Sequence, residues 1–351
     1  MLNIQTLLQM TVEKKASDLH IVPDYFPAVR INNELIPLKT TEIVTREISQ
    51  SMLFSILTEE QKHDLITNKE IDFGYEYGGN RFRTNFYYEK SQLAAAFRYI
   101  PSKIKSLNEL GLPDSLLQFT KFKQGLVLMT GPTGEGKSTT LATLVNEINQ
   151  NDAKHIVTIE DPIEFVYPVG KSIISQRELH QDTHSWSEAL RATLREDPDV
   201  VLIGEMRDFE TIQAAITVAE TGHLVFATLH TSSTPEAINR IIDVFPSNQQ
   251  NQIRSQLASV LKVVMTQRLI PSIDHASRVP ALEILVNIPS VASLIREGKV
   301  HMLDNVLETE ESQNMILFEK YLLKLYRQGL ISKEDALLHA VRLNEIKKFI
   351  V

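Results

Sequence analysis

Apolar and polar positions over about the first 100 residues follow two different spacings. Helical spacing predicts helices over residues 3–15 and 46–66. Short runs of alternating or β-branched residues predict strands at Leu19–Val22, Ala28–Ile31, Leu35–Leu38, Ile71–Tyr77, Phe82–Tyr88 and Ala94–Ile100. Asn32-Asn33 and Gly78-Gly79-Asn80 predict turns between neighbouring strands. We therefore expect this part of the chain to form a small α+β domain.

The pattern changes from Gly125 onward, where short apolar runs alternate with amphipathic segments. The runs predict buried strands at Leu126–Met129, His155–Ile159, Val200–Ile203 and Leu224–Thr228. Such alternation is typical of a mostly parallel sheet with helices on both faces. Roughly the last 80 residues are expected to be mostly helical, with the clearest segments at Met315–Arg327 and Lys333–Arg342. We expect domains at 1–100 and 114–351, joined by a proline-bounded linker at 101–113.

One segment in the second domain, Gly131–Ser138 with the sequence GPTGEGKS, matches the phosphate-binding loop pattern G-x-x-x-x-G-K-[ST]. The glycines of such a loop let backbone N–H groups point at phosphate oxygens, and the following helix adds its positive N-terminus. Lys137 is the expected partner of the β- and γ-phosphates, and Ser138 a ligand of Mg²⁺. Glu135 is expected to point to solvent, because a carboxylate beside a triphosphate would be repelled. The candidate nucleotide-binding residues are Gly131, Pro132, Thr133, Gly134, Glu135, Gly136, Lys137, Ser138 and Thr139.

Acidic and histidine residues follow the other predicted strands. The run VVLIGE at 200–205 is an apolar strand ending in an acid, the Walker B pattern, which makes Glu205 the first candidate for organising Mg²⁺ and water. The block TIEDPIEF at 158–165 holds three carboxylates within five residues; it is either a second acidic arm of the site or a solvated turn. His230, in TGHLVFATLHT at 221–231, can reach a γ-phosphate from the same sheet edge or serve a structural role. His180 and His184 have no third ligand nearby and are predicted to be loop residues.

Composition narrows the class of protein further. The formal net charge is −8, which argues against a general nucleic-acid binder. The chain contains no cysteine, so disulfides and thiolate zinc sites are excluded. The first residues do not read as a signal peptide and no apolar run is long enough to span a bilayer. We expect a cytoplasmic protein without direct membrane insertion.

In their order and spacing along the chain, these four blocks resemble those of the secretion-motor ATPase superfamily. That family calls the block corresponding to TIEDPIEF at 158–165 the Asp box and the block corresponding to TGHLVFATLHT at 221–231 the His box. ASDLHI at 16–21, RFRTN at 81–85 and AFRYIP at 96–101 resemble the smaller domain of that family. The resemblance implies an α/β fold: a RecA-like P-loop ATPase domain, preceded by a smaller PAS-like α+β domain and ending in a mostly helical part. It implies ATP and Mg²⁺ as cofactors and a homohexameric ring. It also implies that Glu164 and Glu205 are catalytic carboxylates, with the general base undecided between them, that His230 reads the γ-phosphate, and that Arg83 and Arg98 reach the nucleotide.

Within the superfamily, the chain resembles the retraction ATPases of type IV pili. It lacks the four-cysteine motif and the extra N-terminal domain of the assembly and secretion ATPases. PSVASLIREGKVHML at 289–303 is similar to the retraction signature, although Ala292 and Ser293 stand where the family has Arg and Asn. The implied partner is the inner-membrane pilus platform protein, with the ATPase peripheral at that membrane. Alternatives are another motor of the superfamily (pilus assembly, type II secretion, competence or a retraction paralogue), a nucleotide-gated binding module and a nucleic-acid translocase.

Overall fold

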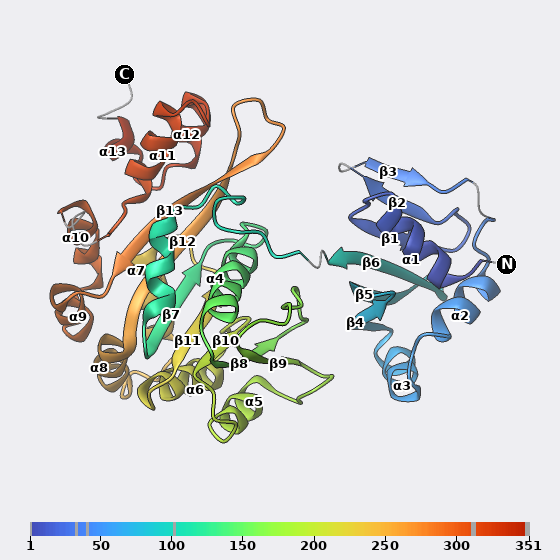
Figure 1. The fold of residues 1–351 in the computed structure, drawn as a ribbon, viewed down its shortest axis with the longest axis horizontal. Helices are drawn as coiled ribbons and strands as arrows, with labels where there is room; N and C mark the ends of the chain where they lie inside the picture. Colours follow the sequence, from blue (N-terminus) through green and yellow to red (C-terminus); the bar gives the residue numbers. More distant parts are fainter. Residues whose placement is uncertain (1, 32–33, 40–41, 101–102, 310–313, 348–351) are drawn as a thin grey trace. The chain divides into compact units, whose positions relative to one another are not determined.

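The computed structural model of the chain describes residues 2–31, 34–39, 42–100, 103–309 and 314–347 (Figure 1). The chain divides into two compact units, each with its own hydrophobic core. The N-terminal unit comprises Met1–Lys103 together with Pro162–Val166, and the second unit comprises Ile104–Asp161 and Tyr167–Val351. The predicted turn at Asn32-Asn33 lies outside the described residues.

The N-terminal unit is built on a six-stranded antiparallel sheet with the order β3-β2-β1-β6-β5-β4. Side chains alternate along β5. Phe82, Thr84 and Phe86 are buried on one face, whereas Arg83 and Asn85 between them are partly exposed. The strands are β1 (Asp18–Ile21), β2 (Ala28–Ile31), β3 (Glu34–Pro37), β4 (Glu70–Tyr77), β5 (Asn80–Glu89) and β6 (Gln92–Ile100). The helices are α1 (Ile4–Glu13), α2 (Arg46–Phe54) and α3 (Glu59–Asn68), and they contribute to the same core.

The single helix predicted over residues 46–66 is wrong, because the structure has two helices there. Thr58 lies at the break and starts α3 with a capping box: its side chain accepts from the backbone N–H of Gln61, and the Gln61 side chain accepts from the N–H of Thr58. These reciprocal bonds satisfy the free N–H groups of a new helix start. The predicted hairpin turn is present, with Gly78 and Gly79 both at positive φ.

The second unit has a seven-stranded sheet with the order β13-β12-β7-β11-β10-β8-β9, parallel except for the β12–β13 pair. Successive residues of β7 face different layers: Leu126 and Leu128 belong to one core, Val127 and Met129 to the other. This is the predicted sheet with both faces covered. The strands are β7 (Gly125–Thr130), β8 (His155–Glu160), β9 (Ile173–Glu178), β10 (Val200–Ile203), β11 (Leu224–Leu229), β12 (Leu261–Pro271) and β13 (Arg278–Val286).

Helices surround this sheet and form the C-terminal part of the chain (Figure 1). Those of the first part are the 3₁₀ segment η1 (Asp114–Lys121), α4 (Lys137–Asn151), α5 (Trp186–Thr193), α6 (Phe209–Glu220), α7 (Thr234–Asp243) and α8 (Gln250–Val260). Those of the last part are α9 (Pro289–Arg296), η2 (Val300–Met302), α10 (Leu303–Thr309), α11 (Phe318–Arg327), α12 (Lys333–His339) and α13 (Leu343–Lys347). Within the described ranges, no helix has the length and apolar character needed to span a bilayer.

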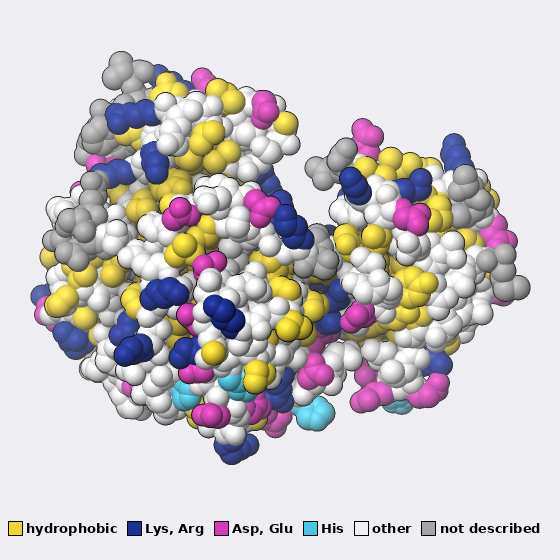
Figure 2. Space-filling view, in the orientation of Figure 1, with side chains coloured by type: hydrophobic (Ala, Val, Ile, Leu, Met, Phe, Trp, Pro, Cys, Tyr) yellow, Lys and Arg dark blue, Asp and Glu magenta, His cyan; other side chains and the backbone are white. Residues whose placement is uncertain are grey.

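The C-terminal part differs from the prediction in three places. It includes β13, which pairs with β12 and reads as an apolar run rather than a helix. The predicted helix Met315–Arg327 begins only at Phe318, because Ile316 forms a β-bridge with Ile284. The predicted helix Lys333–Arg342 ends at His339. Hydrophobic side chains remain at the surface over α11 and α12 (Figure 2), and the exposed ones in this region include Leu330, Leu338 and Val341.

Candidate functional site

The phosphate-binding loop connects the end of β7 to the start of α4 and curls against β12. Gly131 has φ +140°, and a Cβ added there would lie 2.3 Å from the carbonyl oxygen of Gln267. Gly136, the N-cap of α4, has φ +77°, and its added Cβ would lie 2.9 Å from the side-chain nitrogen of Gln267. Both positions therefore require glycine, for backbone conformation and for space. The loop backbone can approach a ligand closely while it is packed on the strand behind it.

Lys137 is buried at the start of α4 and turns back over its own loop. Its Nζ donates to the carbonyl oxygens of Gly131 at 2.6 Å and Pro132 at 2.8 Å. The same Nζ lies 3.3 Å from Nδ1 of His230. Ser138, the second residue of α4, is exposed, unlike its buried neighbour Lys137. The loop thus presents one fixed cation and one exposed hydroxyl at a helix N-terminus, which is the chemistry that a polyphosphate and its metal require.

The side chain of Glu135 does not point to solvent, so that prediction is wrong. Its carboxylate is half-buried and accepts a hydrogen bond from the backbone N–H of Leu269 in β12. Gln267 donates from Nε2 to the Glu135 carbonyl at 2.7 Å and accepts from the hydroxyl of Thr140 at 2.8 Å. The ladder between β7 and β12 ends at Thr130 and Thr266. Beyond that point the phosphate-binding loop takes the place of β7 as the neighbour of β12.

Glu205 lies just beyond the end of β10, and two side chains contact the same carboxylate oxygen. Oε1 of Glu205 is 2.6 Å from Nε of Arg207 and 3.0 Å from Nε2 of His230. Because the Lys137 ammonium only donates, Nδ1 of His230 must accept from it, which leaves the ring proton on Nε2. His230 therefore donates to Glu205 and bridges the phosphate-binding loop to the Walker B acid. The Thr133 hydroxyl lies 3.3 Å from Nδ1 of the same ring.

The environment of Glu205 keeps its carboxylate ionised. Partial burial alone would raise its pKa, but the hydrogen bond from Arg207 and the contact with His230 outweigh burial and lower the pKa below the ordinary value of 4.5. An anionic oxygen at a parallel strand end, one strand away from β11 and two from β7, is suited to bind a divalent cation or to orient water. Glu205 and the exposed hydroxyl of Ser138 are the residues that fit Mg²⁺ by their donor chemistry.

The acidic block at 158–165 is divided between the two units. Glu160 ends β8, where its carboxylate accepts from Thr158 Oγ1 at 2.7 Å and from Gln176 Nε2 at 3.2 Å. Asp161 is exposed. Glu164 is half-buried and belongs to the segment Pro162–Val166, which groups with the N-terminal unit. Of the two predicted catalytic glutamates, the second unit therefore contains only Glu205.

The two predicted site arginines lie next to each other in the N-terminal sheet. Arg83 of β5 is directly opposite Arg98 of β6. Nε of Arg98 is 3.0 Å from a carboxylate oxygen of Asp18, and its side chain is 65% exposed. Asp18 also lies 3.8 Å from Nε of Arg30, so one buried acid is shared by two arginines across three strands. Most of the Arg98 side chain remains accessible from solvent.

Sequence reasoning brought together three of the residues that meet here: Lys137, Glu205 and His230. It missed two others that the structure adds. Arg207 stands two residues after Glu205, so its proximity was a signal that the sequence offered. Gln267 lay beyond prediction, because its role depends on β12, a strand that the sequence did not reveal.

A strand–loop–helix with a buried lysine, together with an acid at the tip of a parallel strand two places away in the same sheet, defines a P-loop nucleotide-binding protein. Residues 94–343 match the family described as "Type II/IV secretion system protein", and the chain belongs to this family. It is 42% identical to the type IV pilus retraction ATPase PilT of Pseudomonas aeruginosa, covering 95% of this chain and 97% of that protein. It is 45% identical to a twitching motility protein of Neisseria gonorrhoeae, covering 88% and 83%. The crystal structure of the pilus retraction motor PilT with bound ADP superposes with a TM-score of 0.93 at 42% identity, covering 99% and 100%.

Proposed function

We propose that this protein is an Mg²⁺-dependent ATPase that drives the retraction of type IV pili. The observation that carries the proposal is the contact chain from Lys137 through His230 to Glu205, which joins the phosphate-binding loop to an ionised Walker B acid. The high identity to a pilus retraction ATPase over nearly the whole chain supports the direction of the work that hydrolysis performs.

The proposed roles follow from the chemistry of each side chain. Lys137 exchanges its loop carbonyls for the β- and γ-phosphates, while the backbone of residues 131–139 wraps the phosphate chain. Ser138 and Glu205 would hold Mg²⁺, which when bound would neutralise charge on the phosphates. His230, released from Lys137, can turn its Nε2–H from Glu205 to an oxygen of the γ-phosphate, which only accepts hydrogen bonds.

The N-terminal unit contributes the remaining proposed groups. Arg83 and Arg98 stabilise charge on the nucleotide, and Glu164 shares the task of activating water with Glu205. We propose that the linker between the domains is 101–113. By the same reasoning the protein works as a homohexamer in the cytoplasm, held at the inner membrane by the pilus platform protein.

The test is ATPase activity measured together with native mass. Wild type is expected to hydrolyse ATP with Mg²⁺ and without DNA. Lys137→Ala is expected to abolish hydrolysis, because the phosphates lose their point charge, and Glu205→Gln to bind nucleotide with little turnover. Turnover of Glu205→Gln at the wild-type rate would instead favour a nucleotide-gated binding module, and dependence on DNA a translocase.

A retraction paralogue is the second candidate, and the α9 sequence favours it. Ala292 is buried in the core, and the neighbouring Ser293 hydroxyl donates to its own helix neighbour Glu297 at 3.0 Å. Two polar groups of the retraction signature are therefore replaced by a packed methyl and a locally bonded hydroxyl. A deletion strain distinguishes the candidates: loss of twitching with retained surface pili supports a retraction motor, whereas unchanged twitching supports an accessory one.

A further inference from the structure

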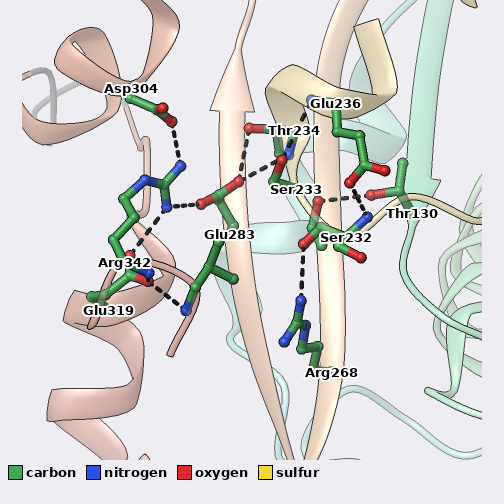
Figure 3. A network of polar contacts seen from close by, with 12 residues as sticks. Thr130, Ser232, Ser233, Thr234, Glu236, Arg268, Glu283, Asp304, Glu319 and Arg342 are labelled. Atoms are coloured by element: carbon green, nitrogen blue, oxygen red, sulfur yellow. Dashed lines mark hydrogen bonds and ion pairs between the residues drawn. The ribbon is translucent and has the colours of Figure 1, made fainter. Parts of the chain in front are cut away.

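A buried ionic network centred on Arg342 joins the C-terminal helices to β13 (Figure 3). Nη1 of Arg342 lies 2.8 Å from Glu283 Oε2 and 3.1 Å from Glu319 Oε2, and Nη2 contacts Asp304. The other Glu319 oxygen accepts from the backbone N–H groups of Val341 at 3.0 Å and Arg342 at 2.6 Å. The Glu283 and Glu319 side chains are 1% and 3% exposed. Burial would lower the pKa of Arg342, but the surrounding carboxylates raise it, so the guanidinium stays charged.

The network reaches the candidate site through the second oxygen of Glu283. Oε1 of Glu283 accepts from the backbone N–H of Thr234 at 2.9 Å and from its hydroxyl at 3.0 Å (Figure 3). Thr234 is fully buried and is the first residue of α7. It directly follows the loop of residues 230–233, here called the His230 loop, whose histidine contacts Lys137 and Glu205. One carboxylate therefore joins the buried arginine to the end of the His230 loop.

Arg268 ties the same loop to the C-terminal helices a second time. Its Nη2 donates to the carbonyl of Ser232 at 3.4 Å, and its Nη1 donates to the carbonyl of His339, the last residue of α12, at 3.3 Å. The guanidinium lies 5.4 Å from the ring centroid of Phe318 at the start of α11. The contacts of Glu283 and Arg268 thus reach two different positions, Thr234 directly after the His230 loop and Ser232 within it. Both contacts connect the loop to the C-terminal segment.

We propose that Arg342 is a positioning residue for the nucleotide site: by pairing with Glu283 it fixes Thr234 and thereby the orientation of His230. A buried carboxylate is strongly disfavoured without a cation, so Glu283 can serve both Thr234 and the C-terminal segment only while the guanidinium is in place. Displacement of the segment carrying Arg342 releases the His230 loop. This inference rests on the proposed ATP hydrolysis at the phosphate-binding loop and adds its control from the C-terminal helices.

Two substitutions break the link with little change in volume. Arg342→Lys replaces the planar fork by a single ammonium, which cannot reproduce the bonds to three carboxylates from three elements. Glu283→Gln leaves one acceptor oxygen, which can serve either Thr234 or Arg342 but not both. The matched control is Arg177→Lys, because Arg177 forms a similar part-buried pair with Glu196 at 2.9 Å. That pair lies between β9 and the turn after α5, and neither residue touches the His230 loop.

The direct measurement is amide hydrogen exchange of the full chain, followed in peptides covering residues 229–235. Arg342→Lys and Glu283→Gln are each expected to speed exchange there by about tenfold relative to wild type and to Arg177→Lys. In the same proteins kcat for ATP is expected to fall about tenfold while the affinity for ADP changes less than about threefold, because the backbone grip of the loop on phosphate is kept. If residues 229–235 of both variants exchange their amide hydrogens at the wild-type rate, the proposal is overturned.

A double-mutant cycle separates this link from a general loss of stability. Thr234→Val removes the hydroxyl on the site side of Glu283, and Arg342→Lys acts on the other side. The losses in kcat are expected not to multiply in the double variant, because both interrupt one path; fully multiplicative losses would refute the link. If Arg342→Lys fails to fold by circular dichroism, Glu283→Gln takes its place in the cycle. If wild type neither binds ADP nor hydrolyses ATP, the proposed function fails, while the exchange comparison still decides the link.

Discussion

Gln267 gives the sharpest test of how β12 supports the phosphate-binding loop. The side chain is 2% exposed, and it bonds the Thr140 hydroxyl at 2.8 Å and the Glu135 carbonyl at 2.7 Å. Gln267→Leu has nearly the same shape but neither hydrogen-bonding group. It leaves one buried hydroxyl and one loop carbonyl without this partner, at a cost of about 1–2 kcal/mol each, or roughly 3 kcal/mol in all.

The expected effect is large enough to measure by thermal unfolding. For a unit of this size, about 3 kcal/mol corresponds to a fall in Tm of roughly 6–12 °C. ADP stabilises the wild type by mass action, by about 2.7 kcal/mol at a concentration of 100 times Kd. That increment is expected to shrink in Gln267→Leu, because the loop that grips the phosphates has lost its support.

The matched control is Gln249→Leu, since Gln249 is exposed just before α8 and its side chain makes no capping hydrogen bond to that helix. It is expected to keep the wild-type Tm and the wild-type response to ADP. If Gln267→Leu unfolds within about 1 °C of the control and gains as much from ADP, the bonds to Thr140 and Glu135 do not support the loop, and the reasoning fails.

Three further predictions concern Glu205, Arg98 and Glu135, which belong to the proposed nucleotide site. The lowered pKa of Glu205 means that its ionic stabilisation is complete above the ordinary value of 4.5 and is lost as pH falls through the lower folded value. The Tm difference between wild type and Glu205→Gln should therefore be present at neutral pH and should disappear as the pH is lowered below about 4.5. It should correspond to no more than about 1 kcal/mol, because Arg207 is mostly exposed. Raising the salt concentration at neutral pH should also reduce this Tm difference. Arg98→Ala should lower ATP turnover without unfolding the protein, because Asp18 keeps Arg30 as a neighbour; unchanged turnover with an unchanged circular dichroism spectrum would remove Arg98 from the site. Glu135→Gln should weaken the bond to the N–H of Leu269 and lower Tm slightly, whereas a carboxylate that faced solvent would leave Tm unchanged.

The parts of the site that sequence could predict are those encoded locally or by a simple topological rule. The phosphate-binding loop is contiguous, and its strand, glycines and lysine are adjacent in the chain. Glu205 and His230 follow β10 and β11, and the C-terminal ends of neighbouring parallel strands meet at one edge of a sheet. Their meeting followed from that rule once the strands were recognised.

The parts that could not be predicted depend on contacts between distant segments. The bond from Gln267 to Glu135 spans 132 positions in the chain, and no strand was predicted over the residues of β12. The orientation of Glu135 follows from that pairing, so the expectation of a solvent-facing carboxylate failed. Arg342 was expected to sit in a helix, but the chain leaves α12 early and gives the backbone N–H of residue 342 to Glu319.

β12 contacts two loops with its two opposite sides, so the number of residues between these contacts is constrained. Gln267 and Leu269 meet the phosphate-binding loop, while the intervening Arg268 reaches Ser232. Inserting or deleting one residue within the strand would exchange these sides, since side chains alternate along it. Related sequences should therefore vary in length at the turn of residues 272–277 between β12 and β13, and keep the spacing from Thr266 to Leu269 without gaps.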